Sequence, residues 1–459
     1  MNIFRVAKTI FTLCFAFATT AVSAQEAIGT WKGALAVQGA QLPIILRIWQ
    51  EDGAYKALMD SPQQNAIGIK VGSIKCENSM LSLSVPGLAV TVVGKISDKT
   101  YTATFTQGNV QLPLIMGRTS PTAKIGRAQE PMPPYPYEAE DVKFSSLESG
   151  IELYGTLTLP KESGKYPAVV LVSGSGTQNR DEELMGHKPF KVIADHLTRH
   201  GIVVLRYDDR EFTTKKYEGA TSRSYASDAL GAVEFLKSID KVDSKHIGII
   251  GHSEGGTIAF MCAAQNKDLD FIVSLAGMAV TGKNCLQEQN RRAIEATGLS
   301  EEIQNKCLEV TMAIFDEYKK REVSDLQQSA QTIVDELIAK HSAQNLPPAL
   351  TQNFVQTLQK TTEWMKFFLT YDPALDIQKI KCRVLALNGS RDVQVLADDN
   401  LDVLRSAENL KNLLTAKKYE GLNHLFQPCT TGEVNEYGSI EQTISEEVLA
   451  DITKWILGQ

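Results

Sequence analysis

The sequence has no excess of basic residues. Its 47 lysine and arginine residues are outnumbered by 54 aspartate and glutamate residues, and the formal net charge is −7. A protein that binds nucleic acid usually carries a basic patch or stripe. We therefore expect no nucleic-acid partner.

Cysteine is also scarce, and no cysteines are spaced like metal ligands. The chain has seven in 459 residues, without a C-x-x-C or comparable pair. Six lie beyond the N-terminal segment: Cys76, Cys262, Cys285, Cys307, Cys382 and Cys429. Cys285 with Cys307, or Cys382 with Cys429, are conceivable disulfides in an oxidising compartment, although buried free cysteine is common in protein cores. We predict neither a metal nor a cofactor.

The apolar stretch near the N-terminus is too short for a typical membrane span. Residues 10–18 follow the basic residues Arg5 and Lys8, and Val22-Ser23-Ala24 is a small-residue cleavage site before Gln25. This pattern predicts a signal peptide at residues 1–24, with export to the periplasm or secretion. We expect no stable membrane insertion after cleavage, and the oligomeric state stays open, with a homodimer among the options.

Residues 25–120 have the pattern of an all-β domain. Thr100-Tyr-Thr-Ala-Thr-Phe-Thr106 alternates polar with apolar or aromatic residues, which is typical of a half-buried strand. Further strands are predicted at 42–50, 81–85 and 88–96, separated by turn signals such as Pro86-Gly87. Closely spaced short strands favour a small barrel or sandwich. Such a domain could bind a ligand or pack against its neighbour, and we favour packing.

Five prolines fall within residues 121–140, which predicts an extended linker. From residue 141 onward strands and helices alternate, as in an α/β domain that runs to residue 459. Strands are predicted at 151–159, 168–172, 202–205, 271–275, 384–387 and 417–420, and helices at 224–239, 401–414 and 445–457. Residues 282–372 interrupt this alternation with apolar residues at helical spacing. We expect them to form a helical lid above the strand ends.

The stretch 246–264 reads as a strand, a sharp turn and a helix. Ile247, Ile249 and Ile250 suit a buried parallel strand. The turn holds the G-x-S-x-G pattern from Gly251 to Gly255, in which glycines leave room for a strained turn that exposes a serine hydroxyl. Alone this pattern occurs by chance in many chains, but between a strand and a helix it predicts a nucleophile elbow at Ser253.

A serine hydroxyl needs a base to take its proton, and the base needs a group that orients it. In the hydrolases that use this elbow the order along the chain is serine, acid, histidine, with each residue after a strand. Asp392 and His424 satisfy that order, and His424 is the only histidine after Asp392. We predict the triad Ser253, Asp392 and His424. The nearby carboxylates that compete with Asp392 are Asp398, Asp399 and Asp402, and His252 is expected to be structural.

The tetrahedral intermediate of acyl transfer needs two backbone N–H donors. One is expected from Glu254, which follows the serine at a helix N-terminus. The other is expected from the turn after strand 168–172, where Ser175 is the first choice and Gly176 the second.

Several segments together resemble a group of exported bacterial α/β-hydrolases that are related to dienelactone hydrolases and act as serine carboxylesterases. They are 172–182, 206–210, 251–256, 367–373, 385–389 and 421–427. The resemblance covers about residues 140–459, and the all-β region resembles the accessory domain of many of these proteins. It implies the same triad. The chain departs from the family at Glu211-Phe212-Thr213-Thr214, where the family has glycine and small residues, and we expect this loop to border the site.

These observations predict an α/β-hydrolase fold with a helical lid insertion, preceded by a small all-β domain. The predicted function is an exported serine carboxylesterase that acts on a small-molecule ester through an acyl-enzyme. A peptidase or thioesterase could use the same triad. A binding protein with an inactive hydrolase fold is the alternative from another class.

Overall fold

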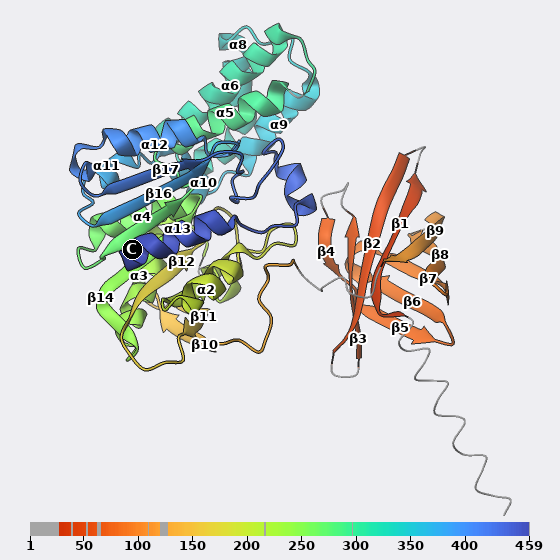
Figure 1. Cartoon of the computed structure of the whole chain (residues 1–459). Helices are drawn as coiled ribbons and strands as arrows, with labels where there is room; N and C mark the ends of the chain where they lie inside the picture. The colour runs from red at the N-terminus through yellow and green to blue at the C-terminus, as the bar shows by residue number, and fades with distance from the viewer. Residues whose placement is uncertain are drawn as a thin grey trace, which may run out of the picture. The chain divides into compact units, whose positions relative to one another are not determined.

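The computed structural model describes residues 27–458 except 38–39, 52–53, 62–65, 109, 120–126, 215–216 and 296. The predicted signal peptide lies outside the described residues. The chain divides into two units (Figure 1). The first consists mainly of Met1–Ala128, and the second holds nearly all of the rest.

The N-terminal unit is one curved antiparallel sheet of nine strands, in the order β4-β3-β2-β1-β9-β8-β7-β6-β5. Its strands are β1 (Gly29–Val37), β2 (Ala40–Glu51), β3 (Ala54–Ser61), β4 (Ala66–Lys70), β5 (Ser73–Glu77), β6 (Met80–Val85), β7 (Val90–Ser97), β8 (Thr100–Gln107) and β9 (Val110–Thr119). The alternation in β8 has the predicted effect, because Tyr101, Ala103 and Phe105 are buried. Tyr101 also donates to the carbonyl oxygen of Leu81 on β6, which ties separate strands across a shared core. The sequence predicted either a small barrel or a sandwich, and a single curved sheet is closer to a barrel.

The second unit is built on an eight-stranded sheet in the order β10-β11-β13-β12-β14-β15-β16-β17. The strands are β10 (Glu138–Ser145), β11 (Glu152–Leu159), β12 (Tyr166–Val172), β13 (Val203–Tyr207), β14 (Val242–His252), β15 (Phe271–Leu275), β16 (Arg383–Gly389) and β17 (Leu414–Tyr419). β10, β11 and β13 pair antiparallel, and every pairing from β13 to β17 is parallel. Parallel strands buried on both faces account for the nearly continuous apolar runs in the sequence.

Helices cover both faces of this sheet. Val170 and Ile249 face the core that is shared with α3 (Ser222–Lys237), α4 (Glu254–Gln265) and α12 (Ala397–Ser406). Val169 and Ile250 face the opposite core, under α2 (Pro189–Arg199) and α13 (Glu446–Leu457). Successive strand residues therefore enter different cores, as the period of a strand requires. The fold prediction of an α/β-hydrolase preceded by an all-β domain is confirmed.

The chain between β15 and β16 is helical. It forms α5 (Gly282–Glu295), α6 (Glu301–Lys320), α7 (Val323–Gln328), α8 (Ala330–Lys340), α9 (Pro348–Gln359), α10 (Glu363–Thr370) and α11 (Ala374–Ile377). Figure 1 shows α5, α6, α8 and α9 stacked on one another, outside the layers that the sheet forms with α2 and α13. These helices share a core of their own, which includes Val310, Ile333 and Leu358.

Two details differ from the sequence-based expectations. The helix predicted at 401–414 ends at Ser406, and a short 3-10 turn, η4 (Glu408–Leu410), precedes β17. The apolar spacing predicted too long a helix because Leu410 is also buried, although it lies in the 3-10 turn rather than in the helix. In addition, the described cysteines form no disulfides with one another, so neither conceivable pair is joined.

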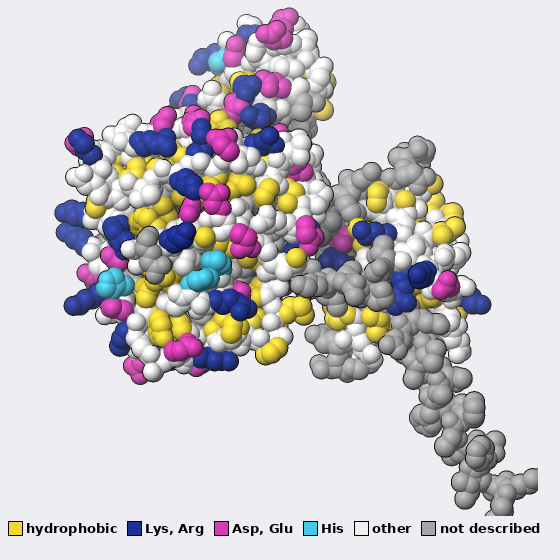
Figure 2. Space-filling model, in the orientation of Figure 1, with side chains coloured by type: hydrophobic (Ala, Val, Ile, Leu, Met, Phe, Trp, Pro, Cys, Tyr) yellow, Lys and Arg dark blue, Asp and Glu magenta, His cyan; other side chains and the backbone are white. Residues whose placement is uncertain are grey.

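The surface of the α/β unit carries charges of both signs. Figure 2 shows lysine and arginine interspersed with aspartate and glutamate over the visible face of this unit. Among the described residues, no helix combines the length and apolar character that crossing a membrane requires.

Candidate active site

Ser253 lies in a strained turn between β14 and α4, with φ 54° and ψ −119°. The flanking glycines explain the sequence pattern. A Cβ on Gly251 would lie 1.9 Å from the carbonyl oxygen of Gly255, and one on Gly255 would lie 2.1 Å from that of Val172. Strain of this kind persists only where the surrounding structure enforces it and is frequent at functional sites. The turn is the predicted elbow.

Asp392 and His424 are brought together by the loops that follow β16 and β17. Nδ1 of His424 lies 2.7 Å from Oδ2 of Asp392, and both side chains are buried. The other carboxylate oxygen of Asp392 accepts the backbone N–H groups of Gln394 and Val395, at 2.8 and 2.9 Å. The carboxylate is thus oriented by three hydrogen bonds. Asp398 has a different partner, because its carboxylate accepts from Lys418 on β17.

The loop after β12 carries the predicted second oxyanion donor. Asp209 holds this loop through the hydroxyl of Ser173 and the backbone N–H of Gln178, at 2.9 and 2.7 Å. Burial raises the pKa of Asp209 well above its ordinary range. Ser175 lines the same pocket as Ser253, whereas Gly176 lines a small adjoining cavity instead. Of the two candidates, Ser175 is therefore the better placed.

Glu254 does more than begin α4. Its carboxylate is buried and accepts from Oγ of Ser222 at 2.6 Å and from Nε1 of Trp364 at 2.9 Å. The Ser175 hydroxyl bonds to it as well, and burial nevertheless raises its pKa. Glu254 thereby connects α3, the inserted helix α10 and the loop after β12. The sequence analysis used only its backbone N–H, because nothing local indicates partners 32 and 110 residues away.

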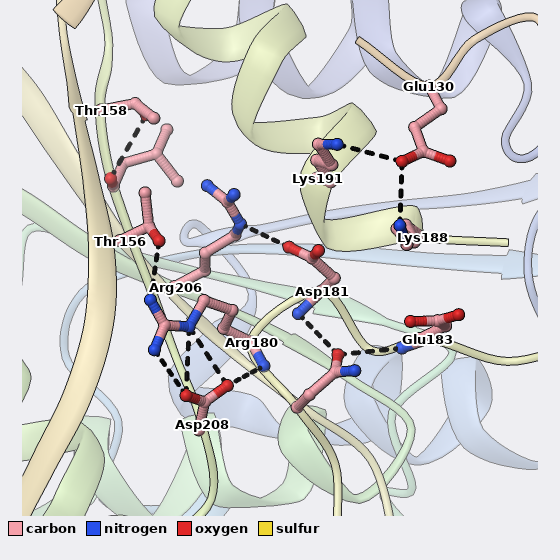
Figure 3. Close-up of polar contacts among 12 residues, drawn as sticks. Glu130, Thr156, Thr158, Arg180, Asp181, Glu183, Lys188, Lys191, Arg206 and Asp208 are labelled. Carbon is pink, nitrogen blue, oxygen red and sulfur yellow. Dashed lines mark hydrogen bonds and ion pairs between the residues drawn. The ribbon is translucent and has the colours of Figure 1, made fainter. Parts of the chain in front are cut away.

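Two sequence motifs, 172–182 and 206–210, interlock through reciprocal charge pairs (Figure 3). The Arg180 guanidinium contacts both carboxylate oxygens of Asp208, and Nε of Arg206 donates to Asp181 at 2.8 Å. The side chain of Asn179 accepts the backbone N–H of Asp181. These contacts fix the backbone of the loop that carries the next residue of the motif.

That next residue is Glu182, which sequence reasoning quoted but gave no role. Its Oε1 accepts from the backbone N–H of Gly174 at 2.8 Å and faces Nδ1 of His252 at 2.9 Å. Its Oε2 is buried, and no atom of the described residues forms a hydrogen bond with it. His252, which was expected to be structural, also contacts His424, whose carbonyl oxygen lies 3.0 Å from Nε2 of His252.

Ser253 and His424 line one pocket of about 360 Å³. The inserted helices form an apolar wall with Leu286 from α5 and Trp364, Met365 and Phe368 from α10. The side chains that contribute polar groups include Gln178, Gln289 and Gln394, and Cys285 also lines the pocket. Burial raises the pKa of the Cys285 thiol to about 12, so this thiol stays protonated and is no competing nucleophile at neutral pH.

The loop at Glu211–Thr214 was expected to border the site, and in the described structure it does not line this pocket. Arg210, the residue before this loop, forms a buried ion pair with Asp228 on α3. Glu211 accepts from the hydroxyl of Tyr225, and Phe212 is exposed. Within the described parts of the chain, no three His, Cys, Asp or Glu side chains gather in a metal-binding arrangement.

A family model described as X-Pro dipeptidyl-peptidase (S15 family) matches residues 149–419. The chain belongs to this family. Esterase EstD of Thermotoga maritima is 27% identical over 376 residues, which are 78% of this chain and 79% of that protein. Dipeptidyl peptidase 8 of Mus musculus is 32% identical over 162 residues, which are 33% of this chain and 18% of that protein.

The solved structures that match this chain include two esterases. The Pyrococcus furiosus esterase PF2001 matches with a TM-score of 0.41 and 14% identity, over 70% of this chain and 91% of that one. Est1E from Butyrivibrio proteoclasticus matches with a TM-score of 0.38 and 14% identity, over 69% and 98%. The family membership and the sheet topology together make this chain a hydrolase of the α/β fold.

Proposed function

We propose that the chain is an exported serine carboxylesterase. Ser253 attacks the ester carbonyl, and His424 takes its proton and returns it to the leaving alcohol. Asp392 orients the imidazole and stabilises its positive charge. Water then releases the acid through the same groups. The backbone N–H groups of Glu254 and Ser175 stabilise the oxyanion.

The apolar wall of the pocket is the observation that favours an ester substrate. An acyl group that leaves water for this wall gains about 25 cal/mol for each Å² of apolar surface buried. Leu286, Met365 and Phe368 supply that surface next to Ser253. Esterase EstD, a relative that matches along most of the chain, supports this choice.

The second candidate is an X-Pro dipeptidyl-peptidase, which family membership favours. A peptide with a free N-terminus brings an ammonium group that needs an acidic partner when it is buried. Glu182 is the acidic side chain among the described residues that line the pocket. Its Oε1 already faces Gly174 and His252, and its Oε2 is buried away from the pocket surface. Among the described residues that line the pocket, the one carboxylate is thus engaged through Oε1 and buried at Oε2, which disfavours such a substrate.

The two candidates are separated by comparing p-nitrophenyl esters, acetate to decanoate, with Gly-Pro-p-nitroanilide. We expect ester turnover with an optimum at one acyl length, and loss of it in Ser253→Ala with an unchanged circular dichroism spectrum. A matched control is His246→Ala, because His246 forms a similar but exposed pair with Asp243. Faster cleavage of the anilide than of every ester would replace the esterase by the peptidase. Export is tested separately, by N-terminal sequencing of the protein from the periplasm or medium.

A further inference from the structure

Both ring nitrogens of His252, the residue before Ser253, face hydrogen-bond acceptors. Nδ1 lies 2.9 Å from the Glu182 carboxylate, and Nε2 lies 3.0 Å from the backbone carbonyl oxygen of His424. A carbonyl oxygen can only accept, so Nε2 carries a hydrogen. Nδ1 then either donates to an ionised Glu182 or accepts from a protonated one. In both cases Glu182 and His252 together hold one extra proton.

The surroundings favour the form in which the ring is charged. Burial opposes a charged ring, but the Glu182 carboxylate, together with the carbonyl oxygen of His424 and the Asp392 carboxylate, outweighs it and raises the pKa of His252. The ionisable groups that face this pair are His424, whose ring centroid lies 4.7 Å from that of His252, and the carboxylates of Asp392 and Asp209. The remaining neighbours on α2, β15 and the segments around α13 are apolar, namely Phe190, Ile193, Leu275, Phe426 and Ile444.

The pair connects three segments that must meet at the active site. Glu182 accepts the N–H of Gly174, which belongs to the loop of the predicted oxyanion donor. His252 is the last residue of β14 and adjoins Ser253. Through Nε2 it also holds the main chain of His424. Asp392 fixes only the ring of His424. The Asn423 side chain holds the backbone of the residues that follow, and His252 adds the contact to the carbonyl oxygen of His424 itself.

We propose that Glu182 and His252 are positioning residues, a proton-sharing pair that holds the main chain of His424 and the loop of Gly174 in place around Ser253. This proposal rests on the proposed function, since it takes Ser253 as nucleophile and His424 as base. The shared proton is essential to the arrangement, because a neutral His252 beside an ionised Glu182 can donate to only one of its two acceptors.

The test uses the full mature protein and two readouts between pH 5 and 9. One is kcat and KM for a p-nitrophenyl ester. The other is the rate constant for labelling Ser253 with a fluorophosphonate, which reports on the nucleophile and base whatever the natural substrate is. The variants are Glu182→Gln and His252→Gln. The matched control is Glu183→Gln, at the exposed neighbouring position seen in Figure 3.

We expect Glu182→Gln to lose about tenfold to a hundredfold in kcat at pH 8, the scale of a small misplacement of catalytic groups. A neutral amide no longer holds the proton on His252, so the ring becomes neutral near pH 8. Lowering the pH favours protonation of the ring again, so the deficit relative to wild type should shrink towards pH 5. KM should change little. His252→Gln should show a similar loss that is independent of pH, and Glu183→Gln should match wild type.

A deficit of Glu182→Gln that is constant with pH would overturn the proposal, because a merely structural role predicts it. Activity of His252→Gln within twofold of wild type would overturn it too, even if Glu182→Gln did not fold. If the wild type hydrolyses no ester but Ser253 is labelled, the carboxylesterase fails while the labelling rates still decide on the pair. If Ser253 is not labelled in the wild type, both proposals fail.

Discussion

Replacing Asp392 by asparagine should abolish most activity while leaving the fold intact. The structure dictates how the new amide would sit. Oδ1 of Asp392 accepts two backbone N–H groups, from Gln394 and Val395. Only the amide oxygen of an asparagine can replace it there, so the NH₂ group must face Nδ1 of His424.

This geometry accounts for part of the expected loss, and the missing negative charge beside the imidazolium accounts for the rest. Turning the amide around would lose two hydrogen bonds worth about 1 kcal/mol each, so the reversed form would be populated at roughly one part in thirty at 25 °C. In the preferred form Nδ1 accepts, which puts the hydrogen of the neutral ring on Nε2. His424 then cannot take the proton of Ser253. In triad enzymes this substitution costs about 10⁴ in kcat, or about 5.5 kcal/mol.

The assay is kcat for p-nitrophenyl ester hydrolysis at pH 7.5, with thermal unfolding of the same samples. We expect kcat to fall by about 10⁴ and the unfolding midpoint to change little, because in the preferred form all three hydrogen bonds of the side chain can still form. Asp243→Asn alters the exposed pair with His246 and should change neither quantity. Retention of more than a tenth of the wild-type kcat by Asp392→Asn would refute the reasoning.

Two further substitutions test the contacts around the site and the start of the α/β unit. Trp364→Phe keeps an aromatic side chain in the pocket wall but removes a hydrogen-bond donor to the buried Glu254 carboxylate. It should lower the free energy of unfolding, measured by urea titration, by about 1.5–3 kcal/mol. The control Trp455→Phe loses only an exposed hydrogen bond to the Thr415 hydroxyl and should lower the free energy of unfolding much less. Glu130→Gln removes a carboxylate whose burial is outweighed by two lysine partners, so that its pKa is lowered. Because the pKa of Glu130 is lower in the folded protein than in the unfolded chain, its ionisation stabilises the folded protein at pH values above the unfolded-chain pKa, near 4.5. This stabilisation is lost as the pH falls through the pKa of the folded protein. The variant should therefore be less stable than wild type at pH 7, by about 1 kcal/mol, and equally stable at pH 2.5. An equal deficit at both pH values would contradict this assignment.

Much of this molecule could be predicted from the sequence where the cause is local. The elbow is an example, since the collisions that require Gly251 and Gly255 involve the turn itself and the adjoining strand. Alternation in β8 reflects the two-residue period of a strand, and the apolar runs of the parallel strands reflect burial on both faces, so both are visible in the local sequence. The helix predicted at 401–414 failed at its end, because Leu410 stays buried after the helix has stopped and spacing alone does not register the change.

The sequence by itself determined the type of fold and the candidates Ser253, Asp392 and His424, because their order and their places after strands are written along the chain. Their catalytic roles stay predictions until they are tested. Only the tertiary structure decided which polar residues meet around them. Glu182 and His252 are 70 residues apart, and Trp364 lies 110 residues from Glu254. A charged or polar residue shows in the sequence only that it needs a partner when it is buried. Which partner it obtains depends on how the strands are ordered in the sheet and where the inserted helices pack.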